Sequence, residues 1–193
     1  MYRSRRSSYP KLPKTIYEVI EVMKNRKITT IENEDFLLDV DSTNNILFYS
    51  TISNLKLLCS CDKIFVDGTF YSCPKYFYQL FTIHIFKNGH YVPLSFFLLP
   101  DKSANTYASA FRCVVEKCSS KNLHFNPTTL IADFEEAIHV GAKFVWPQIK
   151  IIGCRFHLTQ SWWRHIQNFG NYLYFFFIFF LHIYYILYTL TIL

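Results

Sequence analysis

Acidic residues are missing from both ends of this 193-residue chain. No Asp or Glu precedes Glu18, and the first 14 residues instead carry five Lys and Arg residues. No Asp or Glu follows Glu136. The net charge of +6 is therefore partly local. We expect residues 1–14 to be a disordered basic leader, with nucleic-acid binding or nuclear import as the alternative.

A regular cysteine framework and a secretory signal are also missing. The six cysteines are unevenly spaced, which favours reduced thiols in the cytosol or the nucleus. Cys59 and Cys61 are separated by one residue, which is too close for the usual zinc spacing. We interpret this pair as structural.

Charge, glycine and proline are all absent from the 22 residues Tyr172–Leu193. As a helix this segment would span about 33 Å, enough for a bilayer core of about 30 Å. We expect residues 171–193 to form a hydrophobic tail, and a transmembrane helix is one interpretation. The second interpretation is that the segment arose when a broken gene was read into adjacent AT-rich sequence, and we favour it as the origin of the segment. Either way, such a segment would enter a membrane or aggregate.

Residues 15–60 are predicted to form a lead-in of helices and a hairpin. Apolar residues at helical spacing follow Thr15, which fits a capping box with Glu18. Residues 36–40 and 46–49 are predicted to pair across a polar loop. A short helix is expected from Asn54.

Five strand-like segments follow, and helices separate the later ones. The first three strands follow one another directly, which predicts an antiparallel meander. The last two strands come after helices, which predicts parallel crossovers. The predicted fold class is therefore α/β, with a five-stranded mixed sheet and flanking helices. The strands are expected at residues 64–67, 76–86, 91–99, 128–132 and 150–153, and the helices at 103–118, 134–144 and 158–168.

Two carboxylates, Asp67 and Asp133, stand at the carboxyl ends of predicted strands. If those strands are neighbours, the carboxylates converge and can bind Mg²⁺ or Mn²⁺ through hard oxygen ligands. Paired ions of this kind activate water and steady the leaving oxygen of a phosphodiester. The structural alternatives are a turn at Asp67–Gly68 and an N-cap at Asp133, with Glu136 completing a capping box.

Cys154 and His157 follow the fifth predicted strand. A Cys-x-x-His pair is half of a zinc site. The remaining cysteines and histidines supply no matching second half, so packing and hydrogen bonding are the favoured roles.

Several segments resemble the MULE (Mutator-like element) transposase domain in order and spacing, and the resemblance covers roughly residues 35–170. The segments are FVDGTF at 65–70 with YQLFTIH at 78–84, PL at 93–94 with LLPDK at 98–102 and TY at 106–107, DFEEA at 133–137, and GCRFHLTQSWW at 153–163.

The resemblance implies a ribonuclease H-like domain at residues 61–170 and the DDE class of DNA transposition. It implies transposon DNA as the partner, the nucleus as the location, and Mg²⁺ or Mn²⁺ as the cofactor. Asp67 and Asp133 correspond to the first and second catalytic acids and metal ligands. Cys154 and His157 correspond to a Cys-x-x-His signature close to the active site.

The third acid of the family is a Glu that comes after this signature, where the present chain has no Asp or Glu. We therefore expect a C-terminally truncated domain that does not cut DNA unaided. Two alternatives remain: a domesticated DNA-binding protein without catalysis, and a membrane protein anchored through residues 172–193.

Overall fold

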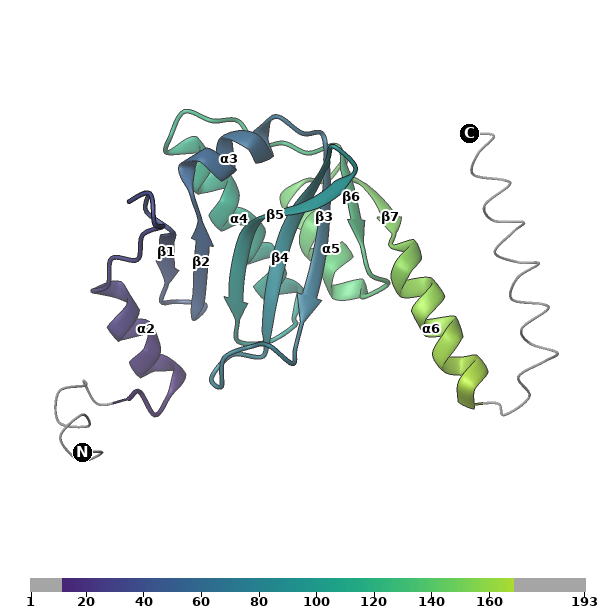
Figure 1. The fold of residues 1–193 in the computed structure, drawn as a ribbon, viewed down its shortest axis with the longest axis horizontal. Coiled ribbons are helices and arrows are strands. Elements are labelled where there is room, and N and C mark those ends of the chain that lie inside the picture. Colours follow the sequence, from purple (N-terminus) through teal and green to yellow (C-terminus); the bar gives the residue numbers. More distant parts are fainter. Residues whose placement is uncertain (1–11, 169–193) are drawn as a thin grey trace. The chain divides into compact units, whose positions relative to one another are not determined.

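A computed structural model describes residues 12–168 of the chain. Its helices are α2 (Ile16–Lys24), α3 (Ile52–Cys59), α4 (Ala104–Ser119), α5 (Glu136–Val145) and α6 (Arg155–Asn168). Its strands are β1 (Leu37–Asp41), β2 (Ile46–Ser50), β3 (Lys63–Thr69), β4 (Gln79–Lys87), β5 (His90–Leu99), β6 (Thr129–Ala132) and β7 (Lys150–Gly153). Helices and strands are mixed along the chain, and they alternate from α4 onwards (Figure 1).

The strands form a seven-stranded sheet in the order β1-β2-β5-β4-β3-β6-β7 (Figure 1). Strands β3, β4 and β5 are antiparallel neighbours, which confirms the predicted meander. Strand β6 is reached through α4 and pairs parallel with β3, which confirms the predicted crossover.

The predicted number of five strands is wrong, because the β1–β2 hairpin belongs to the same sheet. Strand β2 pairs antiparallel with β5, from Leu47 opposite Leu98 to Ser50 opposite Ser95. The side chains of Ile46, Leu47 and Phe48 are all buried, so β2 is an interior strand covered on both faces. Its Phe48 ring stacks on Phe97 of β5 at 4.6 Å between ring centroids.

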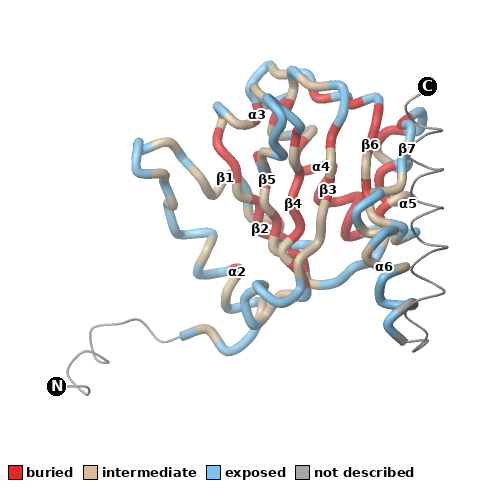
Figure 2. The backbone as a smooth tube through the Cα atoms, turned by 45° about the vertical axis from the view of Figure 1, so that its right-hand side comes forward, coloured by how far each residue is buried: buried red, intermediate tan, exposed pale blue. Residues whose placement is uncertain are grey.

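Helices α4 and α5 lie together on one face of the sheet (Figure 1). Ser103 caps α4 as predicted, since its hydroxyl accepts from the Thr106 amide at 3.2 Å. The two helices approach closely at Gly141, where an added Cβ would lie 2.8 Å from Cβ of Tyr107 and 2.9 Å from the Ala104 carbonyl oxygen. Figure 2 shows the buried backbone concentrated in the central strands and in α4.

The chain divides into two compact units after Ile152, and each is described by itself. The first contains β1 to β6 and α2 to α5, and the second contains α6. Most of the predicted basic leader and the whole predicted tail, residues 171–193, lie outside the described residues. Within residues 12–168, no helix combines the length and the apolar character needed to cross a bilayer.

Candidate active site

Asp67 and Asp133 lie at the same end of two adjacent parallel strands. Strand β3 pairs with β6 from Lys63 opposite Thr129 to Phe65 opposite Ile131, and the numbers of paired residues always differ by 66. Asp67 and Asp133 continue this register two residues beyond the last pair, Phe65 and Ile131. Neighbouring strands lie about 4.8 Å apart. The backbone therefore brings the two carboxylate-bearing residues side by side at the carboxyl-terminal end of β3 and β6.

The capping alternative for Asp133 is wrong. Helix α5 begins at Glu136, and its N-cap is Glu135, which makes no side-chain capping hydrogen bond. The Asp133 carboxylate instead accepts from the adjacent Phe134 amide, with 2.7 Å between Oδ1 and N. Asp133 thus belongs to the loop between β6 and α5 rather than to the helix start.

Side chains from neighbouring elements hold the backbone carbonyls of both aspartates. The Nε2 atom of His139, on α5, lies 2.8 Å from the Asp133 carbonyl oxygen and must donate, because a carbonyl only accepts. The Thr82 hydroxyl, on β4, donates to the Asp67 carbonyl oxygen at 3.2 Å. These contacts restrict the rotation of the peptide groups that carry the carboxylates.

His84 contacts the Thr82 hydroxyl that binds the Asp67 carbonyl oxygen. Its Nε2 lies 2.7 Å from the Thr82 hydroxyl. A hydroxyl has one proton, so when Thr82 donates to Asp67, His84 Nε2 carries its own proton and donates to Thr82. Burial lowers the pKa of His84, and the nearby negative charge of Asp67 opposes that effect. A neutral imidazole with a proton on Nε2 fits this arrangement.

A second hydrogen-bond network lies beneath the same strand ends. The buried Gln79 amide, on β4, donates from Nε2 to the Tyr107 hydroxyl at 2.8 Å. The Tyr107 hydroxyl donates to the Glu135 carboxylate at 3.2 Å. Burial raises the pKa of Tyr107 well above its ordinary value, so the hydroxyl keeps its proton. The network ties α4 to the residues just after Asp133.

Gly68 allows Gln79 to occupy this position. A Cβ added at Gly68 would lie 2.5 Å from Gln79 Oε1. A side chain at the residue after Asp67 would therefore force the buried Gln79 amide to shift away from β3. The predicted turn at Asp67–Gly68 is wrong, because both residues belong to β3 and pair with Thr82 and Phe81 of β4.

Sequence reasoning did not identify Thr82, His84, Tyr107 or His139 as parts of the site. Thr82 and His84 alternate with buried apolar residues of β4, a pattern that predicts the opposite face of a strand and no specific partner. His139 follows Asp133 by six residues and becomes its neighbour only because α5 folds back. These contacts depend on register and helix position, which local patterns do not specify.

Cys154 and His157 belong to the second compact unit. Cys154 immediately precedes α6, and its carbonyl oxygen accepts from the Leu158 amide at 3.2 Å. His157 lies in the first turn of α6, beside the Phe156 ring at 5.6 Å between centroids. The helix starts earlier than the predicted residue 158, so the signature histidine is helical. A role for this pair in the site stays a prediction.

The cysteines are free thiols in the structure. Burial raises the pKa of the Cys113 and Cys118 thiols to about 12, and Cys59 lies 3.5 Å from Cys118 between sulfur atoms. Thiols with such a raised pKa are poor nucleophiles and poor metal ligands. These residues pack the helix side of the fold.

Among the described residues, Asp67 and Asp133 are two candidate oxygen ligands for a divalent cation, which is fewer than a complete coordination sphere requires. Asp67 and Asp133 supply the carboxylate chemistry that Mg²⁺ and Mn²⁺ prefer. Across residues 12–168, no cluster of three or more His, Cys, Asp or Glu side chains is arranged to hold a metal. The pair therefore fits such an ion in donor type and falls short in ligand number.

Comparison with known proteins finds a matching family model. The family model described as "MULE transposase domain" matches residues 63–161. The matched segment begins at the first residue of β3 and includes Asp67, Asp133, Cys154 and His157. No curated protein matches the chain.

Proposed function

This chain belongs to the MULE transposase domain family, and from that premise we propose that it retains two of the three acids of a DDE-type DNA-cleavage site. Its function is transposase-derived. Asp67 and Asp133 are the proposed first and second acids. The observation that carries the proposal is the common register of β3 and β6, which places both residues at one sheet edge.

The proposed fold assignment is ribonuclease H-like. Three antiparallel strands followed by a parallel strand beyond a helix support it, and β1 and β2 extend the sheet at its other edge. The proposed domain limits are residues 61–170, preceded by the lead-in at residues 15–60. Cys154 and His157 are proposed as the supporting signature of the site.

The family generally uses a divalent metal. Asp67 and Asp133 would hold Mg²⁺ or Mn²⁺ through carboxylate oxygens. The bound metal would supply an activated water and charge stabilisation for phosphodiester cleavage. The residues around the carboxylates keep them in place: Thr82 and His139 bind the two backbone carbonyls, and Tyr107 anchors the loop after Asp133 through Glu135. The proposed partner is transposon-end DNA, and the proposed location is the nucleus.

We propose that the 193-residue chain is inactive by itself. The sequence contains no Asp or Glu after Glu136, so the third acid of the family pattern has no counterpart. A metal held by two protein carboxylates lacks a ligand that would fix its geometry. Glu135 does not replace it in this proposal, since its carboxylate accepts from Tyr107.

The test is DNA cleavage and strand transfer with Mg²⁺ or Mn²⁺ and element-end DNA. We expect no product above background from the full chain. Metal-dependent cleavage that disappears in Asp67→Ala would overturn the inactivity and support the assigned role of Asp67. Cleavage that persists in both Asp67→Ala and Asp133→Ala would contradict the proposed site itself.

A second candidate function is DNA binding without catalysis. The presence of only two of the family's three acids favours it. This function predicts salt-dependent DNA binding that survives Asp67→Ala combined with Asp133→Ala. Loss of binding in that double variant would contradict it. The predicted membrane anchor at residues 172–193 lies outside the described residues.

A further inference from the structure

An exposed aromatic cluster extends from Phe65, two residues before Asp67 on the same face of β3, towards the end of the sheet where β3 begins, and lysines stand at that end. The cluster consists of Phe65, Phe86 and Tyr91, from β3, β4 and β5. Phe86 and Tyr91 are cross-strand partners, with ring centroids 5.0 Å apart. Tyr91 also meets Phe65 edge to face at 4.9 Å.

A bulge brings Tyr91 towards β3. The register of β4 and β5 shifts between Ile83, opposite Ser95, and His84, opposite Pro93. A bulge bends a strand and increases its local twist, and Figure 1 shows the β4–β5 hairpin curving at that end of the sheet. Tyr91 therefore reaches Phe65 although β4 lies between their strands.

The outer two rings of the aromatic cluster remain accessible. Phe86 is 53% exposed and Tyr91 is 62% exposed. Phe65 beneath them is only half-buried. An aromatic group that supports its neighbours while leaving its rings open to solvent provides a rigid surface on which a flat ligand can stack.

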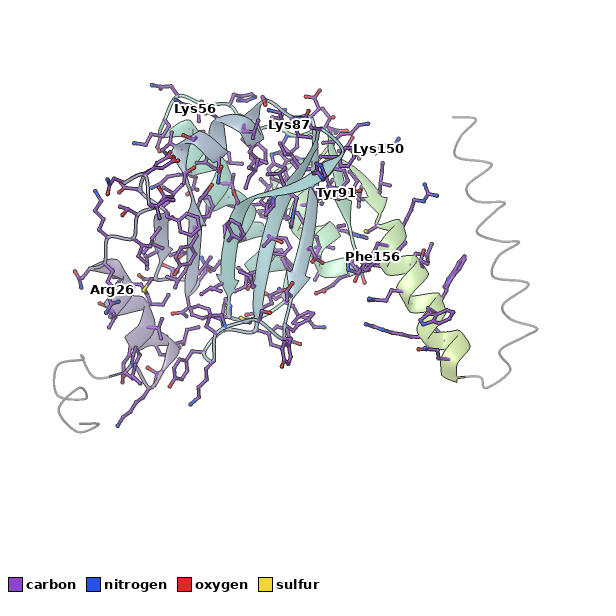
Figure 3. All side chains as sticks on the ribbon, in the orientation of Figure 1. Arg26, Lys56, Lys87, Tyr91, Lys150 and Phe156 are labelled. Carbon is purple, nitrogen blue, oxygen red and sulfur yellow. The ribbon has the colours of Figure 1, made fainter. Side chains whose placement is uncertain are left out.

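Basic side chains stand at the same end of the sheet. Lys63 begins β3, and Lys87 pairs with His90 beside the hairpin turn. Lys150 begins β7, and its amide donates to the Thr128 carbonyl oxygen next to β6. Figure 3 shows Lys87, Tyr91 and Lys150 at this end. All four basic residues are exposed.

These lysines have little local compensation. The ion pairs found among the described residues are Lys24–Glu21 and Lys27–Asp35, and neither involves this end of the sheet. Two acids are close to the cluster in sequence: Asp62, next to Lys63, and Asp67, two residues after Phe65. Three lysines against the carboxylates of Asp62 and Asp67 leave a small excess of positive charge, which lies on the side of Phe86 and Tyr91.

We propose that this surface binds single-stranded nucleic acid. Exposed aromatic rings stack on unpaired bases of any sequence, and nearby lysines neutralise the phosphates. A duplex fits less well because its bases already stack on one another. A protein partner is less favoured because lysine is depleted at protein interfaces. The surface adjoins the proposed cleavage site through Phe65, but stacking on its rings does not depend on metal or on catalysis.

Fluorescence anisotropy of the full chain with labelled oligo(dT) of about 15 nucleotides tests the proposal. Tyr91→Ala is expected to weaken binding about 5-fold or more, the effect of losing one stacked base. Tyr91→Phe is expected to bind like the wild type. Tyr71→Ala is the matched control, because Tyr71 is 100% exposed and follows β3 at its other end.

The charge contribution is read from the salt dependence. Lys63→Gln and Lys87→Gln are each expected to lower the slope of log K against log salt by about 0.7. Lys143→Gln on α5 should leave the slope unchanged. Combining Asp67→Ala with Asp133→Ala should not weaken oligo(dT) binding, because the rings and the lysines of this surface are kept, which distinguishes a failure of this proposal from a failure of the proposed active site.

Two results would overturn the proposal. One is equal affinity of Tyr91→Ala and Tyr71→Ala for oligo(dT), which would remove the stacking platform. The other is tighter binding of the wild type to a duplex of the same length than to oligo(dT). Thermal unfolding of the tyrosine and lysine variants, expected to lie close to the wild type because these side chains are exposed, excludes misfolding as the cause of a loss.

Discussion

At the scale of single residues, the Tyr107 hydroxyl links three elements near the proposed site. It accepts from Gln79 on β4 and donates to Glu135 at the start of α5. Tyr107→Phe keeps the ring and removes both hydrogen bonds. Gln79 Oε1 already has no hydrogen-bond partner among the described residues, so the variant leaves this buried amide with a poorly satisfied Nε2 as well.

We expect Tyr107→Phe to lower the free energy of unfolding by about 1–3 kcal/mol, the cost of an unsatisfied buried polar group. Urea unfolding with an unchanged m value measures it. Tyr71→Phe, at a fully exposed position, should change nothing. Equal stability of the wild type and Tyr107→Phe would show that the hydroxyl carries no structural role.

The sequence also had limits at this scale. The proximity of Asp67 and Asp133 was predictable, because both end apolar runs of an α/β pattern. The donors to their carbonyls, Thr82 and His139, were not, because each contact depends on the position of a neighbouring element. The sequence around Asp133 also fits a helix N-cap. Only the backbone, in which α5 begins at Glu136, shows that Asp133 lies in the preceding loop.

At the scale of elements, the start of α4 depends on one carboxylate. Asp101 accepts from the Ser103 amide at 2.8 Å and the Thr106 hydroxyl at 2.6 Å. Partial burial raises the pKa of Asp101, but the hydrogen bonds from Thr106 and Ser103 outweigh it, so the pKa lies below its ordinary 3.8. An anion at a helix amino terminus is also favoured by the helix dipole.

A lowered carboxyl pKa stabilises the folded state above the unfolded pKa, and the contribution is lost as pH falls through the folded value. Asp101→Asn should therefore cost about 0.5 kcal/mol at pH 7, a small value because the carboxylate is largely exposed. The difference from wild type should shrink below pH 3.8. Urea unfolding from pH 7 to pH 3 measures this, with Glu32→Gln as the control. A difference independent of pH would contradict the charge argument.

The sheet shows why element positions were predictable and their partners were not. Apolar runs and helix caps located β3 to β7 and α4 within a few residues, since burial and capping act locally. The β1–β2 hairpin was also located, but its place beside β5 was missed. The sequence of residues 36–50 does not specify which strand pairs with the hairpin. That pairing depends on how the whole hydrophobic core packs.

At the scale of the whole molecule, the first compact unit separates its charges along the strands. Asp67 and Asp133 lie at one end of β3 and β6, and Lys63 and Lys150 begin strands at the other end. The carboxylates therefore sit away from the nearest strand-end lysines. Like charges side by side on adjacent strands are destabilising, so this arrangement has a cost when no cation is bound.

This cost predicts opposite effects of one substitution with and without metal. Asp133→Asn removes one of two neighbouring negative charges and keeps an oxygen that can accept from the Phe134 amide. Without metal, we expect it to stabilise the chain by about 0.2–1 kcal/mol. With free Mn²⁺ at about ten times its dissociation constant, the wild type should gain about 1.4 kcal/mol and the variant much less.

The order of stability should therefore reverse between a chelator and saturating Mn²⁺, as read from urea unfolding of both proteins. Asp62→Asn, at the opposite end of β3, is the control and should respond to Mn²⁺ like the wild type. Two protein carboxylates suffice for this reversal because it requires binding and no chemistry. If Asp133→Asn destabilises the metal-free chain, or if Mn²⁺ stabilises both proteins equally, then the two aspartates do not share a cation, and the assigned site fails independently of whether the chain cuts DNA.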